Sequence, residues 1–245
     1  DAVKLIRGKK GSTVVLTVKK PDETIKNISI VRDIVVIQST YAKYGTFNID
    51  GGVIGYINLP SFYRDFDNYS NRNAADDVKM ALIELKDTDG LVFDLRNNGG
   101  GSLKDAVDIS GFFIDRGPIV QVSTNDQSRQ TYRDYDASVV YTKPLVVLVN
   151  TFSASASEIV SAALQDYNRA IVMGSKHTFG KGTVQKVVSF DNAFFGASSS
   201  KKLGFLKITI QEYFRISGKS TQFYGVESDI VFPTKYDYLE VGERT

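Results

Sequence analysis

Three segments of the chain carry side chains that could perform nucleophilic catalysis. In the first, Ser155 follows an apolar run and precedes a helical pattern, so its hydroxyl would lie at the N-terminus of a helix. Backbone N–H groups and the positive end of the helix dipole favour an oxyanion at such a position. Ser155 and Glu158 also fit the S-x-x-E capping box, so capping of the helix is the competing interpretation.

The second segment places Lys181 between Gly180 and Gly182, directly before a β-rich stretch. A lysine acts as a base only as the neutral amine, and burial favours that form. Gln185 follows on the same face of an extended strand, where its amide could orient the amine without adding charge. The competing interpretation of this segment is a hairpin turn with an exposed lysine.

The third segment, Asp94–Gly101, ends in consecutive glycines. Glycine adopts positive φ readily and lets backbone N–H groups approach a ligand, so the Gly99–Gly100 turn could donate hydrogen bonds to an oxyanion. The segment has neither the Gly-Lys-Ser/Thr ending of a phosphate loop nor the glycine spacing of a dinucleotide-binding loop. A flexible turn before a helix cap at Ser102 is the competing interpretation.

Composition limits the choice of a catalytic base. The 245 residues include no cysteine and a single histidine, His177, which excludes thiolate catalysis, disulfides, cysteine-ligated metals and multi-histidine metal sites. The net charge of +2 gives no electrostatic argument for binding nucleic acid or an anionic membrane. A Ser–Lys pair is therefore the natural arrangement, and a Ser/His/acid triad that uses His177 is its rival.

The elements that must position these segments follow from hydrophobic patterns. Strands are predicted at Leu91–Leu95 and Leu145–Val149, and helices at Asn73–Lys86 and Ser155–Tyr167. This alternation predicts an α/β fold with a mostly parallel sheet covered by helices. Because ligands of such sheets bind at the carboxyl ends of the strands, we expect the two strands to be parallel neighbours. They would then deliver the glycine turn and Ser155 to the same edge.

The two ends of the chain show other patterns. Residues 1–33 combine a helical pattern at Asp1–Arg7 with strands at Thr13–Val18 and Ile25–Val31, which is too little chain to bury much core alone. From Thr183 onward the sequence is β-rich, with strands predicted at Val184–Phe190, Phe205–Phe214 and Val226–Val231. The longest apolar run, Leu145–Val149, is far shorter than the roughly 20 residues that span a bilayer.

Taken together, these segments resemble the carboxyl-terminal processing, or tail-specific, proteases of peptidase family S41, in particular the bacterial periplasmic branch. The resemblance implies a ClpP/crotonase-like core with a C-terminal β-rich part. It also implies a serine endopeptidase without cofactor or metal that cleaves unfolded or C-terminally marked proteins in the periplasm or cell envelope. The motifs that carry it are Gly55–Phe62, Asp94–Gly101, Phe152–Ile159, Phe179–Gln185 and Gln222–Ile230.

The resemblance also implies a role for individual residues. The nucleophile falls on Ser155, the general base on Lys181 and the glutamine that positions the base on Gln185. The oxyanion-hole amides fall on Ala156 and on Gly99 and Gly100, and Asp166 matches an aspartate with a supporting role. The sequence departs from the family pattern in a loop that is one residue longer before Phe179 and in a missing proline at Ser228.

By the same resemblance, residues 1–33 match the C-terminal remnant of a PDZ domain and residues 34–245 match the catalytic domain. In the family, the PDZ domain captures the free C-terminus of the polypeptide substrate. The part of that domain that would do so is absent from this sequence. The alternative function is therefore a catalytically inactive peptide-binding module with the same fold.

Overall fold

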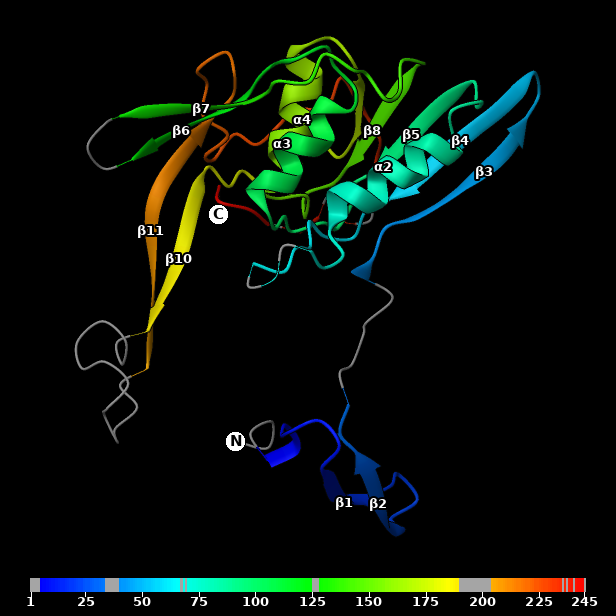
Figure 1. The fold of residues 1–245 in the computed structure, drawn as a ribbon, viewed down its shortest axis with the longest axis vertical. Coiled ribbons are helices and arrows are strands. Elements are labelled where there is room, and N and C mark those ends of the chain that lie inside the picture. The colour runs from blue at the N-terminus through cyan, green and yellow to red at the C-terminus, as the bar shows by residue number, and fades with distance from the viewer. Residues whose placement is uncertain are drawn as a thin grey trace. The chain divides into compact units, whose positions relative to one another are not determined.

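The computed structural model describes residues 5–33, 40–66, 68, 70–124, 128–189, 204–234, 236, 238–239 and 241–244. The chain divides into two compact units, Asp1–Gln38 and Ser39–Thr245 (Figure 1). All residues of the predicted site belong to the second unit. No helix among the described residues is long and apolar enough to cross a membrane.

The first unit is a β-hairpin. Its strands, β1 (Thr13–Lys19) and β2 (Ile25–Val31), pair antiparallel in continuous register, as the sequence predicts. The predicted helix Asp1–Arg7 begins outside the described residues, and Leu5 and Ile6 are helical. Most side chains of both strands are exposed. The assignment of this hairpin to a PDZ domain stays a prediction.

Six strands of the second unit form the central sheet, in the order β12-β9-β8-β5-β4-β3. Neighbours pair parallel except β3 and β4, which confirms the predicted mostly parallel sheet. The strands β5 and β8 are parallel neighbours, as expected, with Leu91 opposite Leu145. The bounds are β3 (Lys43–Ile49), β4 (Gly52–Asn58), β5 (Gly90–Asp94), β8 (Leu145–Val149), β9 (Ile171–Gly174) and β12 (Ile230–Val231).

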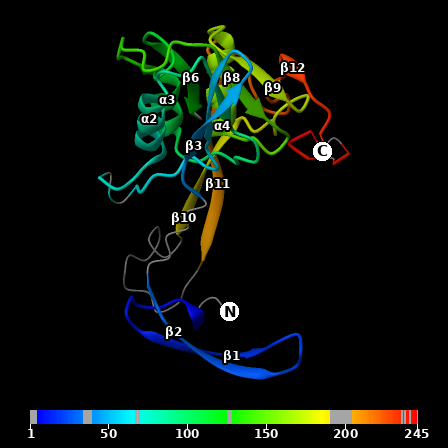
Figure 2. The same ribbon diagram turned by 90° about the vertical axis from the view of Figure 1, so that its right-hand side faces the viewer.

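Helices lie on one face of this sheet (Figures 1 and 2). They are α2 (Ala74–Glu84), α3 (Leu103–Gly111) and α4 (Ala156–Asp166), and α3 packs against both others. In β8 the alternate residues Leu145, Val147 and Val149 are buried while those between are half-buried, as expected for a sheet with one fully covered face. The predicted cap of α3 is present, because the Ser102 hydroxyl accepts from the Asp105 N–H at 3.2 Å.

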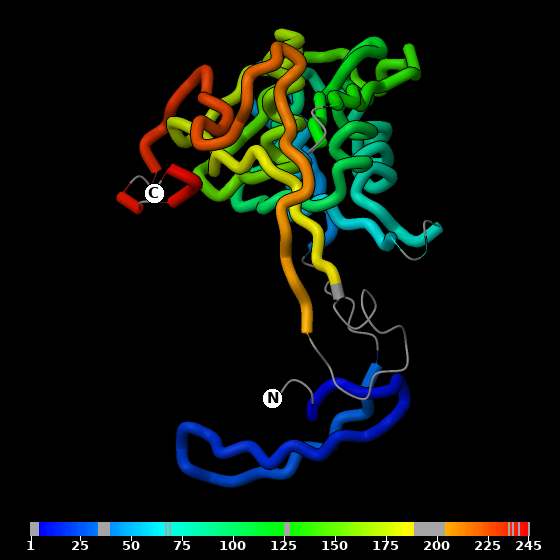
Figure 3. Tube along the Cα trace, turned by 90° about the vertical axis from the view of Figure 1, so that its left-hand side faces the viewer, coloured from blue at the N-terminus to red at the C-terminus, as the bar shows by residue number. Residues whose placement is uncertain are grey.

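A second, antiparallel sheet has the order β10-β11-β6-β7. Its strands β10 and β11 run side by side (the yellow and orange strands of Figure 3) and account for the predicted β-rich part. The last residue of the predicted strand Val184–Phe190 lies outside the described residues. The predicted strand Val226–Val231 is shorter in the structure, where only Ile230–Val231 forms β12. The bounds are β6 (Gly117–Thr124), β7 (Arg129–Asp134), β10 (Thr183–Ser189) and β11 (Phe205–Phe214).

Candidate active site

Most of the predicted site residues meet at one cavity of about 250 Å³. The loop after β5 brings Gly99 to it and the turn after β8 brings Ser155, so the two strands deliver both segments to the same edge of the sheet, as expected. Lys181 reaches it from the segment that enters β10, and Gln185 reaches it from β10 itself. The cavity is lined by Gly99, Gly101, Leu103, Ser155, Ala156, Ile159, Lys181, Thr183, Val184, Gln185, Lys207 and Tyr213.

The glycine loop packs directly on the turn that carries Ser155. Gly100 has a φ of +99°, and a Cβ atom built on it would lie 2.8 Å from the Ala154 carbonyl oxygen and 2.8 Å from the Ser155 Cβ. The Ala154 N–H donates to the Asn98 carbonyl at 3.0 Å, so the two segments are also joined by a backbone hydrogen bond. Only glycine therefore fits at position 100 without displacing the serine turn.

Hydrogen bonds fix the shape of the glycine loop. The Gly100 N–H donates to the Asn98 side-chain oxygen at 2.9 Å, and the Gly100 carbonyl accepts from the Phe62 N–H at 3.0 Å. Asn98 is fully buried and donates its side-chain N–H to the Leu59 carbonyl at 2.7 Å. Of the two predicted glycine amides, that of Gly100 is thus hydrogen-bonded to Asn98, whereas Gly99 lines the cavity.

Ser155 has an unusual backbone conformation. Its φ of 57° and ψ of −112° belong to a backbone region that residues other than glycine rarely adopt. Such a conformation costs about 1–3 kcal/mol of strain. The residue is half-buried, and its backbone N–H donates to the Glu158 carboxylate at 2.7 Å. A serine on a sharp, strained turn between a strand and a helix is an arrangement that presents the hydroxyl at the surface of a catalytic cavity.

The backbone of Lys181 is held on both sides. Its N–H donates to the Glu158 carboxylate at 3.0 Å. Its carbonyl accepts from the Thr221 hydroxyl at 3.1 Å and also from the Tyr213 hydroxyl. These contacts use only main-chain atoms of Lys181, and the residue lines the cavity. Gln185 lines the same cavity and is exposed.

Glu158 and Tyr213 are buried beside this pair of residues. The capping box of Ser155 and Glu158 is present, as the sequence predicts, but the other contacts of Glu158 and the place of Tyr213 were not predicted. Glu158 has an exposed fraction of 0% and stands in a run of buried residues at the start of α4. Burial raises the pKa of the Glu158 carboxyl to about 7, although four hydrogen bonds donated to it act in the opposite direction. Burial also raises the pKa of the Tyr213 phenol well above its usual value. A glutamate inside an apolar helical run is the one sequence signal that could have revealed this site.

The Glu158 carboxyl is expected to make the stability of the fold depend on pH. Its pKa in the folded protein, about 7, exceeds its ordinary value of 4.5, so between these pH values the unfolded chain binds fewer protons than the folded one. The free energy of unfolding therefore falls as pH rises through this window, by on the order of 3 kcal/mol, and the loss is complete above pH 7.

Urea unfolding at pH 5 and pH 8 measures this effect. Between these two pH values the protein should lose stability relative to its Glu158→Gln variant, whose side chain does not ionise. A stability difference between the two proteins that is the same at both pH values would contradict the expectation.

Asp166 and His177 do not line the cavity. Asp166 ends α4, about 16 Å along the helix axis from Ser155, and its carboxylate accepts from the Arg215 guanidinium at 2.6 and 3.1 Å. Nδ1 of His177 lies 2.8 Å from the Thr178 carbonyl oxygen. The structure thus brings Lys181, and not His177, to the cavity that contains Ser155.

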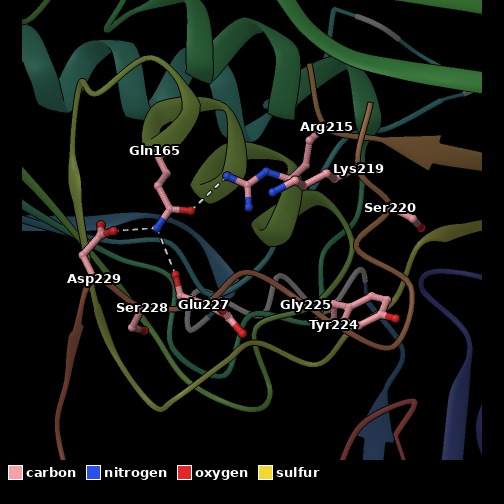
Figure 4. Close-up of a pocket in the computed structure, with 9 residues that line it drawn as sticks. All are labelled: Gln165, Arg215, Lys219, Ser220, Tyr224, Gly225, Glu227, Ser228 and Asp229. Carbon is pink, nitrogen blue, oxygen red and sulfur yellow. Dashed lines mark hydrogen bonds between the residues drawn. The ribbon is translucent and has the colours of Figure 1, made fainter. Parts of the chain in front are cut away.

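A larger cavity of about 560 Å³ lies at the other end of α4 (Figure 4). In it the Gln165 side chain donates to the Glu227 carbonyl and to the Asp229 carboxylate, both at 2.9 Å, and accepts from Arg215 at 2.9 Å. None of the residues predicted to be catalytic lines this cavity. Within the described part of the chain, no group of three or more His, Asp or Glu side chains is arranged to hold a metal ion.

Comparisons with known proteins agree on one family. Residues 53–232 match the model of peptidase family S41. The tail-specific protease of Haemophilus influenzae is 42% identical over 247 residues, which cover 99% of this chain and 34% of that protein. The carboxyl-terminal-processing protease of a Picosynechococcus species is 38% identical over 249 residues, covering 100% of this chain and 55% of that protein.

A solved structure shares the fold. The photosystem II D1 C-terminal processing protease superposes with a TM-score of 0.65 and 27% sequence identity, over 92% of this chain and 56% of that one. The chain therefore spans between about a third and just over half of the length of the relatives described.

Proposed function

Because the chain belongs to peptidase family S41, we propose that it forms the catalytic part of a carboxyl-terminal processing serine endopeptidase. Its substrates are unfolded or C-terminally marked polypeptides. The observation that carries the proposal is the cavity at the carboxyl edge of β5 and β8, which Ser155 and Lys181 both line. The names of the relatives, which describe processing at the carboxyl terminus, support this substrate class.

The proposed reaction is acyl transfer. Neutral Lys181 takes the proton of the Ser155 hydroxyl as the oxygen attacks a peptide carbonyl carbon. Backbone N–H groups of Ala156 and of Gly99, both of which line the cavity, stabilise the oxyanion of the tetrahedral intermediate, and Gly100, whose N–H is bonded to Asn98, shapes the turn. Protonated Lys181 then gives its proton to the leaving amine, and water hydrolyses the acyl-enzyme. Gln185, which lines the same cavity, orients the Lys181 amine.

Other parts of the proposal concern residues that do not line the cavity. Asp166 supports the site indirectly, because its ion pair with Arg215 ties the end of α4 to the segment that follows β11. Residues 1–33 belong to a PDZ domain that binds the C-terminus of the substrate. The protein acts in the periplasm or cell envelope, and its similarity to the tail-specific protease of Haemophilus influenzae supports this part of the proposal.

A pair of substrates tests the proposed function. The full-length protein is incubated with one unfolded polypeptide that carries a free C-terminal carboxylate and with the same polypeptide amidated at its C-terminus. Mass spectrometry should show internal cleavage of both, with faster cleavage of the free acid. Binding of both polypeptides without any cleavage would contradict the proposal and favour the inactive peptide-binding module. Equal rates would make the protein a general endopeptidase.

Gly100→Ala is expected to lower kcat/KM by about 10²–10³-fold, the usual loss when one donor of an oxyanion hole is misplaced. The added Cβ atom would overlap the Ala154 carbonyl and Ser155, so both the glycine turn and the serine must shift. Gly51→Ala is the matched control, because Gly51 also has a positive φ, +91°, but its added Cβ atom would meet no atom within 4 Å. Near-normal activity of Gly100→Ala would show that the turn does not contribute to the oxyanion hole.

A further inference from the structure

We infer that Glu158 is a positioning residue whose carboxylate fixes the proposed nucleophile and the proposed base relative to each other. One of its oxygens, Oε2, accepts hydrogen bonds from the backbone N–H of Ser155 at 2.7 Å and from that of Lys181 at 3.0 Å. A single atom therefore joins the two residues on which the proposed reaction depends, and the inference rests on that proposed function.

The second oxygen strengthens the same link. Oε1 accepts from the Thr178 hydroxyl at 2.6 Å and from the Gly180 N–H at 2.7 Å. The Thr178 hydroxyl in turn accepts from the Val226 N–H at 2.8 Å, which anchors this segment to a third part of the chain. The carboxylate thus connects the start of α4 to the whole segment that leads into the base.

A role in capping α4 does not explain these contacts. A capping box uses the glutamate only to accept from the N–H of the cap residue, here Ser155. Three other donors, Thr178, Gly180 and Lys181, belong to a later segment of the chain that is not part of a helix, and the Tyr213 hydroxyl on β11 donates to Oε2 at 3.5 Å. All five donors are backbone N–H or hydroxyl groups without charge, so the carboxylate is not buried as half of an ion pair. A fully buried carboxyl group thus links the two segments.

The link bears on catalysis because the proton transfer needs the Ser155 hydroxyl and the Lys181 amine within about 3 Å of each other. A displacement of about 1 Å in such a pair lowers the rate by about 10²-fold. The strained φ of Ser155 also persists only where neighbouring contacts over-determine it, and the bond from its N–H to Glu158 is one of these contacts. Loss of the carboxylate would therefore loosen both partners.

Two variants of the full-length protein test the inference. Glu158→Gln keeps the shape but replaces one acceptor oxygen by an NH2 group, which faces two donors. Glu158→Asp keeps both oxygens but is shorter, so it cannot reach both segments. Each should lower kcat for hydrolysis of an unfolded polypeptide by about 10²-fold. KM should change by less than about 3-fold, because Glu158 is fully buried and does not line the cavity.

Asp105→Asn is the matched control. Asp105 is also fully buried, and its carboxylate accepts from the Ala75 N–H at 2.9 Å and from Arg64, away from the cavity. At a temperature where thermal unfolding shows it to be folded, this variant should keep kcat within about 3-fold. A loss of kcat in the Glu158 variants that the control does not share supports the positioning role.

Three results would decide against the inference. A folded Glu158→Gln protein with near-normal kcat would show that the two segments keep their places without the carboxylate. Unfolding of both Glu158 variants under conditions where Asp105→Asn is folded would assign Glu158 to stability alone. A rise in KM with unchanged kcat would point to substrate binding. Each of these results leaves the proposed function intact, which fails instead if Ser155→Ala keeps its activity.

Discussion

Ser155→Ala is expected to reduce hydrolysis of an unfolded polypeptide by at least about 10⁴-fold, because the variant has no oxygen that can attack the peptide carbonyl. The fold should persist. The bond from the Ser155 backbone N–H to Glu158 remains possible in alanine, whereas the side-chain half of the capping box is lost, which costs about 1 kcal/mol of stability. The residual activity should equal the rate enhancement that the oxyanion hole and substrate binding provide without a nucleophile.

Ser161→Ala is the matched control for this loss. Ser161 is a buried serine on the same helix, and its hydroxyl donates to the Ser157 carbonyl at 2.7 Å, away from the cavity. This variant should lose stability, by about 1 kcal/mol, and keep its turnover number. If Ser155→Ala retained more than a few per cent of the activity of the unmodified protein, Ser155 would not be the nucleophile.

The frame of the fold could be predicted because its signals are local. Leu145–Val149 is an uninterrupted apolar run and Leu91–Phe93 is a shorter one that ends at Asp94, and such runs form the buried strands of a parallel sheet. Two residues, Ser102 and Asp105, predict the start of α3, and they are hydrogen-bonded to each other in the structure. Because the loops after both strands lie at one sheet edge, the place of the site followed from the order of the elements.

The strands that were not predicted lack such signals. All residues of β3 are exposed or half-buried, so no apolar face marks it as a strand. In β7 no residue is fully buried and the first three are all exposed. The strand β6 packs against α3, which directly precedes it, but also against α4 and between β7 and β11, which lie further along the chain. Strands of this kind are stabilised by pairing with particular neighbours, which the local sequence does not encode.

The same distinction applies to the site. The sequence predicted the capping contact of Glu158 because Ser155 lies close to it in sequence, whereas its other donors come from the segment before β10 and from Tyr213. Tyr213, which contacts the Lys181 carbonyl, lies on β11 and gave no signal at all. The sequence left His177 and Lys181 as alternative candidates for the general base, and they are close neighbours along the chain. The structure separates them, since only Lys181 lines the cavity that contains Ser155.

Lys181→Arg is expected to be as inactive as Ser155→Ala, with a loss of at least about 10⁴-fold in kcat/KM. A guanidinium stays charged at every pH at which the protein is folded, so it cannot take the proton of the Ser155 hydroxyl. Lys181→Ala should be equally inactive, since it has no base at all. Both variants should fold, because the contacts that hold this residue use its backbone N–H and carbonyl, which every residue retains.

His177→Ala separates the Ser–Lys pair from its rival. Nδ1 of His177 lies 2.8 Å from a backbone carbonyl, and the ring does not line the cavity, so this variant should keep kcat/KM within about 3-fold. Initial rates for Lys181→Arg, Lys181→Ala and His177→Ala are compared on one polypeptide after thermal unfolding has shown that all three are folded. If Lys181→Arg stayed active while His177→Ala lost activity, the base would be the histidine, and the cavity would have to rearrange before it could act.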